Sequence, residues 1–249
     1  MKFSKLMSVI LAACTLLTAC DEKKDGSGKT LTVGVSADYA PFEFFNNGEI
    51  IGFDIDLMSE VAKRLGKDVK FKDMSFDAIL GSLSTQRIDA AISSITPTPE
   101  RRKSIDFSKE YIQSNRVMLC KGTSSINSVS DLAEATVGVQ SGSTHEVYAN
   151  KVLSKDVHVT VKSLTRVPDL LQAMEIGNVS CLVMDNAEAN AILKSQANLK
   201  SISLPGEVNS SAIGFPKDSP LTSQVDKILT EMEADGYLTK LKEKWLPTS

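Results

Sequence analysis

Between residues 31 and 92 the chain changes repeatedly between the period of a strand and the period of a helix. Apolar strand-like runs lie at 31–35, 69–71 and 88–92, and the two stretches between them place apolar residues on one helical face. Parallel strands need a long crossover connection, which is usually a helix. The order strand, helix, strand, helix, strand therefore predicts a doubly wound parallel sheet of the α/β class.

A second series of alternating strand-like and helix-like patterns begins at residue 117. Extended polar stretches near 111–115 and 209–213 lie on either side of this series. Two such crossings predict two α/β lobes joined by two strands, so that the chain leaves the first lobe, builds the second and returns. We expect residues 30–112 plus 213–249 in lobe 1 and residues 113–212 in lobe 2.

Two polar loops follow strands of the first series, at 36–39 and at 93–101. Ligands of such sheets bind outside the carboxyl ends of the strands. In the second loop, Thr98-Pro99 is expected to start a helix. A helix N-terminus favours an anion, and the planar guanidinium of Arg101 matches a carboxylate. We interpret this loop as a carboxylate-binding corner; the alternative is that Arg101 and Arg102 form a solvated basic first turn.

The N-terminus has the pattern of an export signal. Lys2 and Lys5 precede an apolar run at 6–17 that is too short to span a bilayer. The sequence Leu17-Thr18-Ala19-Cys20 then matches the signal of bacterial lipoproteins, in which cleavage leaves a lipidated cysteine. An ordinary cleaved secretory signal with an incidental cysteine is the alternative interpretation.

The lipoprotein interpretation predicts where the protein is found. Residues 1–19 are then a removed signal peptide, Cys20 carries the lipid, and residues 20–29 are a flexible tether. Asp21 resembles the residue that retains lipoproteins at the inner membrane of many Gram-negative bacteria. We therefore expect a periplasmic protein that is anchored by lipid to the inner membrane, where that sorting rule applies.

Composition excludes several classes of function. The 249 residues carry a net charge of −3 with 6% aromatic residues, so no basic stripe is available for nucleic acid. The two histidines, His145 and His158, lie in no metal-ligand spacing, and we expect no metal and no cofactor. Cys120 and Cys181 both lie in apolar strand-like runs. We expect two buried thiols, although an oxidising compartment permits a disulfide.

An ordered set of short motifs covers essentially the whole mature chain. These motifs are Tyr39-Ala40-Pro41-Phe42-Glu43, Gly52-Phe53-Asp54-Ile55-Asp56-Leu57, Phe76-Asp77, Arg87-Ile88-Asp89-Ala90, Thr96-Pro97-Thr98-Pro99-Glu100-Arg101, Asp106-Phe107-Ser108, Gly138-Val139-Gln140-Ser141-Gly142-Ser143-Thr144 and Asp235-Gly236-Tyr237. Together they resemble the polar amino-acid substrate-binding proteins of bacterial ABC importers, solute-binding protein family 3. The resemblance implies two α/β lobes, a two-strand hinge and a ligand held between closing lobes, the type II periplasmic binding protein fold.

The resemblance also implies a role for each matching position. Arg101 would hold the ligand α-carboxylate, and Asp185 would hold the α-ammonium, because a zwitterion removed from water needs partners for both charges. Tyr39 and Phe76 would enclose the ligand side chain. The remaining ligand-binding positions are Ser36, Ser94, Thr96, Gln140 and Thr144. Without the family, Asp185 is equally well a helix N-cap, and the two aromatic residues are equally well part of the core.

The identity of the side chain that is bound follows less directly. An acidic residue often occupies the position of Ser36 in cationic amino-acid binders, but Asp38 and Glu43 lie close in sequence and supply the same charge. Met184 stands where some glutamine binders have a more polar residue. Arginine is therefore favoured slightly, and glutamine comes next.

Three functions compete on these residues. The first is a non-catalytic, monomeric receptor that delivers an amino acid to an ABC permease and ATPase. The second is a periplasmic enzyme similar to cyclohexadienyl dehydratase, for which only Glu43 and His145 offer an acid or base. The third is a surface lipoprotein that senses amino acids. The absence of a recognisable catalytic arrangement favours a protein that is not an enzyme.

Overall fold

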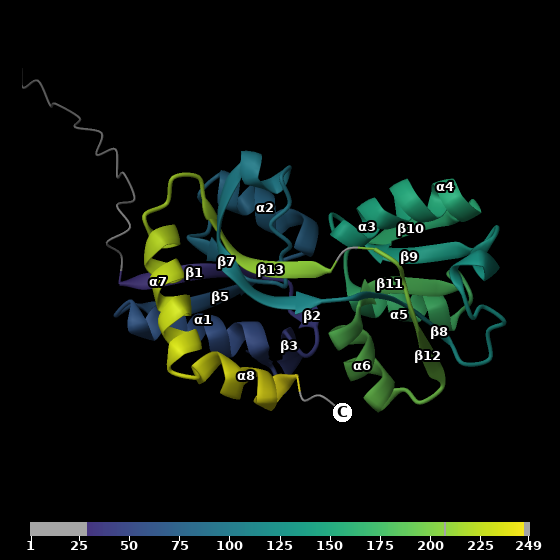
Figure 1. The fold of residues 1–249 in the computed structure, drawn as a ribbon. Coiled ribbons are helices and arrows are strands. Elements are labelled where there is room, and N and C mark those ends of the chain that lie inside the picture. Colours follow the sequence, from purple (N-terminus) through teal and green to yellow (C-terminus); the bar gives the residue numbers. More distant parts are fainter. Residues whose placement is uncertain (1–28, 207, 247–249) are drawn as a thin grey trace, which may run out of the picture.

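The computed structural model describes residues 29–206 and 208–246, and these form two lobes, each built on a five-stranded sheet (Figure 1). The signal peptide, Cys20 and most of the tether lie outside the described residues. Within the described residues, no helix combines the length and the apolar character needed to cross a membrane.

The first sheet has the order β5-β1-β6-β13-β7. β1 is parallel to β5 and β6, whereas β13 runs antiparallel to both of its neighbours. The strands are β1 (Thr30–Val35), β5 (Asp68–Asp73), β6 (Ala90–Ala91), β7 (Ile105–Ser114) and β13 (Asn209–Pro216). A small antiparallel sheet adjoins it, made of β2 (Asp38–Tyr39), β3 (Glu43–Asn46) and β4 (Glu49–Ile51). The doubly wound arrangement predicted for residues 31–92 is present.

Helices cover both faces of the first sheet. One face packs against α1 (Phe53–Arg64), α7 (Leu221–Ala234) and α8 (Tyr237–Trp245), and the other against α2 (Phe76–Ser84). These helices form because their apolar residues recur with helical spacing and turn toward the sheet, as Leu57, Met58 and Val61 do in α1. Burial of this apolar surface is what stabilises the lobe.

The second sheet has the order β10-β9-β11-β8-β12. Its strands are β8 (Arg116–Lys121), β9 (Thr136–Gln140), β10 (Thr160–Leu164), β11 (Cys181–Asp185) and β12 (Leu199–Ser203). Its helices are α3 (Thr144–Tyr148), which continues as a π-helix (Ala149–Leu153), α4 (Ser154–Val157), α5 (Val167–Glu175) and α6 (Asn186–Ser195). The described residues also contain short 3-10 helices at Arg101–Lys103, in the first lobe, and at Val129–Leu132, in the second. Apolar clusters fill both faces of this sheet as well.

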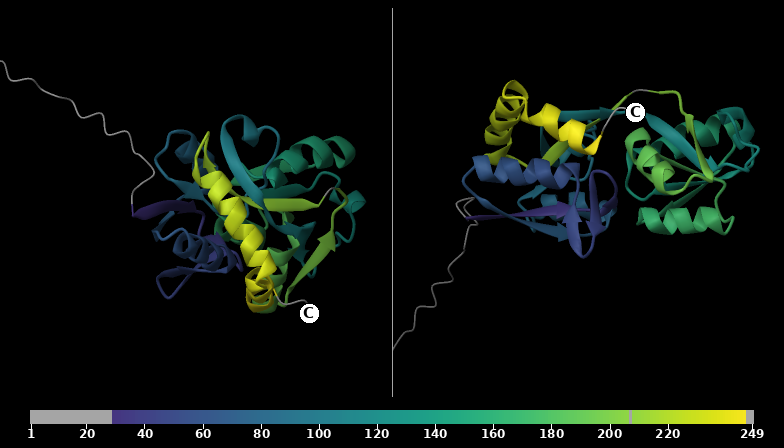
Figure 2. Two further views of the ribbon diagram at one scale, coloured as in Figure 1. Left: turned by 60° about the vertical axis from the view of Figure 1, so that its left-hand side comes forward. Right: turned by 90° about the horizontal axis from the view of Figure 1, so that it is seen from below.

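Two connections join the lobes, as the sequence predicted. β7 runs into β8, and β12 returns to β13, so the paired strands β7 and β13 form the base of both crossings. The right-hand view in Figure 2 shows the lobes side by side, with the connections running from one to the other. The ends of β7 and β13 that point toward the second lobe are Ser114 and Asn209, which pair with each other.

The expectation of two free thiols is wrong. Cys120 and Cys181 form a disulfide, with their Cα atoms 4.3 Å apart. They are directly opposite each other in the antiparallel pair of β8 and β11, and both are fully buried. The sequence did not fix this pairing because the register between two strands that are 61 residues apart depends on the assembled sheet.

Candidate functional site

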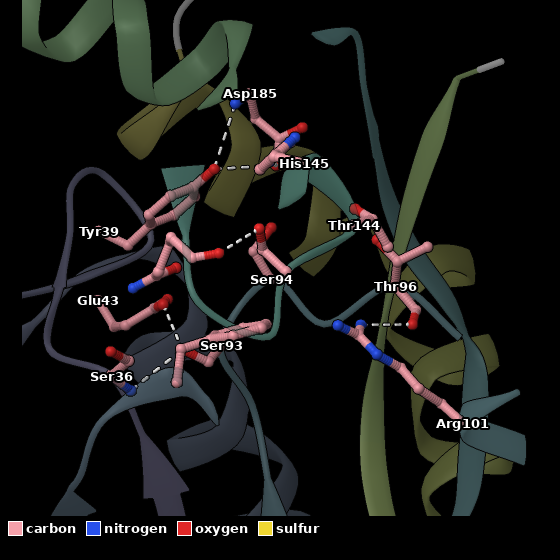
Figure 3. Close-up of a pocket in the computed structure, with 13 residues that line it drawn as sticks. Ser36, Tyr39, Glu43, Ser93, Ser94, Thr96, Arg101, Thr144, His145 and Asp185 are labelled. Atoms are coloured by element: carbon pink, nitrogen blue, oxygen red, sulfur yellow. Dashed lines mark hydrogen bonds and ion pairs between the residues drawn. The ribbon is translucent and has the colours of Figure 1, made fainter. Parts of the chain in front are cut away.

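A pocket lies between the two lobes, and its lining is almost entirely polar or aromatic (Figure 3). All nine residues predicted to bind the ligand line it, namely Ser36, Tyr39, Phe76, Ser94, Thr96, Arg101, Gln140, Thr144 and Asp185. Four further residues complete the lining, namely Glu43, Ser93, Ser143 and His145. The loops after β1 and β6 supply one wall, and the loop after β9 and the end of β11 supply the other. The carboxyl ends of strands thus converge on one place, as the fold class predicts.

Arg101 provides the cationic side of the pocket. Its Nη1 donates to the carbonyl of Thr96 at 2.8 Å, and its Nη2 donates to the carbonyl of Gly142, in the other lobe, at 2.9 Å. The guanidinium also lies over the Phe76 ring, 5.6 Å from the centroid. Among the described residues it forms no ion pair, and burial lowers its pKa to about 10, so it stays charged near neutral pH. The guanidinium charge is therefore available to an anion.

The backbone before Arg101 differs from the expected helix. Only a single 3-10 turn forms, at Arg101–Lys103. Thr98 still acts as a cap, because its hydroxyl oxygen accepts the Arg101 amide at 3.2 Å. Arg102 is exposed and stacks over Phe107, 5.4 Å from the ring centroid. The alternative of a solvated basic turn thus describes Arg102, whereas Arg101 faces the pocket.

Asp185 provides the anionic side. It ends β11 at the N-cap position of α6, but its side chain makes no capping hydrogen bond. Its carboxylate instead accepts hydrogen bonds from the hydroxyl of Tyr39 at 3.1 Å, the hydroxyl of Ser114 at 2.8 Å and the amide of Asn209 at 3.1 Å. Burial alone would raise the pKa of this carboxyl, but the charge of nearby His145 and these hydrogen bonds lower it to about 2. Asp185 is therefore a permanent anion.

Asp185 also connects the site to the crossing strands. Ser114 ends β7 and Asn209 begins β13, so the carboxylate is held by both connections between the lobes. Tyr39 brings the first lobe to the same carboxylate, and its hydroxyl oxygen also accepts the Asp185 amide at 3.2 Å. A ligand charge bound here acts on the residues about which the lobes would move.

The two aromatic residues belong to the core and to the pocket at once. Tyr39 stacks on Phe42 with 5.9 Å between ring centroids, and Phe76 packs in the cluster around α2. Each is almost fully buried, and each also lines the pocket. Both residues are therefore part of the core, and both are also within reach of a ligand in the pocket.

The third side of the pocket lies around Glu43. Its Oε1 accepts a hydrogen bond from the hydroxyl of Ser93 at 2.6 Å, and the Ser93 oxygen accepts the amide of Ser36 at 3.1 Å. Figure 3 shows these three residues together, on the opposite side of the pocket from Arg101. Burial and the neighbouring Asp54 raise the pKa of Glu43 well above its usual range. The charge of Glu43 therefore depends on its surroundings, unlike that of Asp185.

From the sequence, His145 was only a candidate acid or base, whereas the structure places it in the lining of the pocket. His145 is buried, 3.7 Å from Asp185 through Nε2. Its Nδ1 accepts a hydrogen bond from Arg116 at 3.4 Å. Ser93 and Ser143 were not singled out, although both stand in loops that were, next to Ser94 and Thr144 respectively. Adjacency within those loops was the one signal that could have included them.

Direct contacts hold the two lobes together around the pocket. Arg166 of the second lobe binds both carboxylate oxygens of Asp73 at 2.9 Å each, and the Val167 amide donates to Asp38 at 3.3 Å. Gly142 comes so close that a Cβ on it would lie 3.1 Å from the Cα of Asp77, and its φ of +76° also favours glycine. The glycine thus allows the loop after β9 to reach Arg101.

Comparison with known proteins agrees with this geometry. Residues 31–248 match the family described as bacterial extracellular solute-binding proteins, family 3. The chain is 38% identical over 249 residues to the arginine-binding extracellular protein ArtP of Bacillus subtilis (strain 168), a match that covers 97% of each chain.

Solved structures give the same result. An ancestral arginine-binding protein bound to arginine is 39% identical, with a TM-score of 0.83 over 88% of this chain and 99% of that chain. One bound to glutamine is 37% identical, with a TM-score of 0.83 over 89% and 99%. The ancestral amino acid-binding protein AncCDT-1, a precursor of cyclohexadienyl dehydratase, is 33% identical, with a TM-score of 0.80 over 87% and 95%.

Proposed function

The chain belongs to family 3 of the bacterial extracellular solute-binding proteins, and from this we propose that it captures a polar amino acid, preferably arginine, for an ABC importer. The predicted two-lobed fold of a type II periplasmic binding protein is confirmed. In the proposal, lobe 1 (residues 30–112 and 213–249) and lobe 2 (residues 113–212) close on the ligand.

One observation carries the proposal, namely three polar sides of one pocket that differ in charge. Arg101 offers a cation without an ion-pair partner among the described residues, and Asp185 offers a permanent anion. These fit the α-carboxylate and α-ammonium of an amino acid, which must both be met when the zwitterion leaves water. In the proposed complex, Ser94, Thr96 and Thr144 assist Arg101, and Gln140 lines the second lobe's wall.

The preference for arginine is supported by the third side. Glu43 lies there behind Ser36 and Ser93, and a guanidinium bound between Tyr39 and Phe76 would meet this carboxyl group. Glutamine offers no positive charge to Glu43. It remains the second candidate, because the seryl hydroxyls on this side also suit an amide.

Binding is tested by isothermal titration calorimetry on the fragment that begins after Cys20. We expect saturable binding of arginine, and weaker binding of glutamine and of citrulline, which has the shape of arginine without its charge. Tighter binding of glutamine than of arginine would reverse the preference. No binding of any polar amino acid would contradict the proposed function.

An enzymatic role has little support in the geometry. Glu43 is hydrogen-bonded to Ser93, and His145 lies between Arg116 and Asp185. Neither is positioned as an acid or base beside a nucleophile. Conversion of prephenate or arogenate by the purified protein, followed by product absorbance, would overturn the non-enzymatic proposal.

We further propose that the protein is a monomeric lipoprotein of the periplasm, exported by residues 1–19 and anchored through Cys20, with an ABC permease and ATPase as its partners. Exchange of Cys20 for alanine then moves the protein from the membrane fraction to the soluble fraction. Mass spectrometry of the mature N-terminus detects the lipid directly. A Cys20→Ala protein that stays in the membrane fraction would contradict the anchor.

A further inference from the structure

Two carboxyl groups lie close to each other, Glu43 in the lining of the pocket and Asp54 beside it. Glu43 and Asp54 are both 0% exposed. One oxygen of Glu43 accepts a hydrogen bond from Ser93, and one oxygen of Asp54 accepts the Ser94 amide at 2.8 Å and the Tyr111 hydroxyl at 2.9 Å. The other oxygens, Oε2 of Glu43 and Oδ1 of Asp54, have no donor among the described residues.

The local backbone forces this approach. Gly52 has a φ of +138°, and a Cβ on it would lie 2.1 Å from the carbonyl oxygen of Phe42. The amide of Asp54 donates to that same carbonyl at 2.9 Å. The first turn of α1 is thereby fixed against the start of β3, and the side chains of Glu43 and Asp54 meet.

The surroundings leave the pair without a cation. Apart from each other, the groups that face it are Ser93, Ser94, Tyr111 and a third carboxylate, Asp38. Asp38 is itself near Arg166, at 3.7 Å, whereas neither Glu43 nor Asp54 forms an ion pair within the part of the chain described.

Two buried like charges at such close range are strongly unfavourable, so one of the two groups keeps a proton. Burial raises the pKa of both, and each also affects the titration of the other through a mutual hydrogen bond, which needs a proton between two acceptors. The two oxygens that lack a donor are the atoms left to hold this proton.

We propose that Glu43 and Asp54 share one proton while the pocket is empty, and that a cationic ligand side chain replaces this proton, so that arginine binding releases it to the solvent. The carboxylic O–H bond breaks, the proton passes to buffer, and the resulting carboxylate pairs with the guanidinium. The net charge of this part of the pocket is the same before and after binding, because the positive charge of the guanidinium takes the place of that of the proton. The inference rests on the proposed capture of a cationic amino acid.

The pair is also linked by hydrogen bonds to the two strands, β7 and β13, that lead from one lobe to the other. Asp54 is bonded to Tyr111 in β7, and Ser94, whose amide it accepts, is 3.0 Å from Ser211 in β13 through their hydroxyl oxygens. Both crossing strands therefore contact groups that bind the pair. Loss of the proton would therefore affect groups that contact the strands that join the lobes.

Proton release makes affinity depend on pH in one direction. The ligand cation lowers the pKa of the pair, so the free protein binds more protons than the complex, and affinity rises with pH between the two pKa values. In that interval the dissociation constant of arginine should fall about tenfold per pH unit. Citrulline brings no charge, and its affinity should not change with the state of the pair.

The test is calorimetric titration of the unaltered fragment with arginine and with citrulline, each in phosphate and in Tris at equal pH. These buffers differ in ionisation enthalpy, so the difference in heat counts the protons released. We expect about one proton per arginine within the interval and none per citrulline. Arginine heats that are equal in both buffers from about pH 7 to 8, where both buffers hold the pH, would overturn the inference. Absence of any saturable heat would instead overturn the proposed function.

Variants identify the groups responsible. Glu43→Gln should abolish proton release and lower arginine affinity while citrulline binding is retained. Asp54→Asn should move the release to lower pH, because Glu43 no longer faces a second carboxyl group. Glu49→Gln, at the exposed start of β4 in the same hairpin as Glu43, is the matched control and should leave release unchanged. His145→Gln should retain the release, and loss of the release in that variant would assign the proton to His145 and overturn the inference.

Discussion

Of the three charged residues that line the pocket, Arg101 and Asp185 carry fixed charges, whereas the charge of Glu43 can change. The guanidinium of Arg101 donates to two carbonyl groups, and His145 together with several hydrogen bonds lowers the pKa of Asp185 to about 2. Glu43 faces Asp54, and its pKa is raised well above its usual value. The fixed charges fit the part that all amino acids share, and the adjustable one fits the part in which they differ.

The difference shows how one fold separates affinity from selectivity. A charge that is hydrogen-bonded in advance requires no rearrangement when the ligand arrives, so it favours every ligand with the matching group. A carboxyl group that must lose a proton favours only a ligand that supplies a positive charge. Substitutions on the two sides should therefore have different signatures, and the following predictions are arranged by expected size.

Arg101→Ala should have the largest effect. It removes the cation facing the ligand carboxylate, and leaving a buried charge unpaired costs about 3–5 kcal/mol, so affinity should fall roughly 10²- to 10⁴-fold for all amino acids alike. Calorimetric titration measures the loss. Arg102→Ala is the matched control, because Arg102 is exposed and should change affinity less than about twofold. Unchanged affinity in Arg101→Ala would show that Arg101 does not bind the ligand carboxylate.

Asp185→Asn should come next. The amide keeps the shape of the side chain but not the charge, and hydrogen bonds to charged groups contribute about 1.5–3 kcal/mol, so affinity should fall about 10- to 100-fold. Because the pKa of Asp185 is about 2, this contribution should stay constant from about pH 4 to 8. Asp169→Asn, exposed in the same lobe, serves as the control. If the difference in affinity between wild type and Asp185→Asn changes with pH in this range, Asp185 does not carry a fixed charge.

Glu188→Gln tests the contrast between ionised and protonated carboxyl groups through the free energy of unfolding. Glu188 lies in α6, is 1% exposed, and has no hydrogen-bond partner among the described residues for either oxygen. Burial, and then the charge of Asp185, raise its pKa well above the usual value. Glutamine mimics the protonated form, so the substitution should stabilise the protein by about 1–2 kcal/mol near pH 8.

The sign of the pH dependence follows from the raised pKa. The carboxyl group costs nothing below its unfolded pKa, and its penalty grows as pH rises toward and through the folded pKa. Urea unfolding at about pH 4.5 and about pH 8 should therefore show a difference between Glu188→Gln and wild type that increases with pH. The exposed Glu231→Gln is the control. A difference that stays constant or shrinks would show that the pKa of Glu188 is not raised in the folded protein.

Asp73→Asn should have the smallest effect. The Arg166–Asp73 ion pair bridges the lobes outside the pocket, and both side chains are partly exposed, so it should contribute only about 0.2–1 kcal/mol to binding. Affinity should fall by less than about fivefold, and equally for arginine and citrulline. The loss should diminish at high salt, because salt screens an exposed pair. A large loss that differs between the two ligands would mean that selectivity extends beyond the pocket.

Much of the architecture was already present in local patterns of the chain. Strand and helix periods predicted the alternating elements, and the two polar crossings predicted two lobes, because each pattern depends on residues within a few positions of one another. Arg101 was found from its place after a buried strand, although the helix expected there is only one 3-10 turn. Nine of the thirteen residues that line the pocket followed from the family resemblance.

Contacts between distant segments were decided by the tertiary structure alone. The Cys120–Cys181 disulfide depends on the register of β8 against β11, and no local pattern contains that register. The pairing of Glu43 with Asp54 depends on a glycine that brings β3 and α1 together. Sequence therefore determined which elements form and which charged residues are available, because those follow from local periodicity and chemistry. Whether a given carboxyl group is a fixed anion or holds a proton was determined by its packing, because pKa depends on burial and on neighbours that only the folded chain provides.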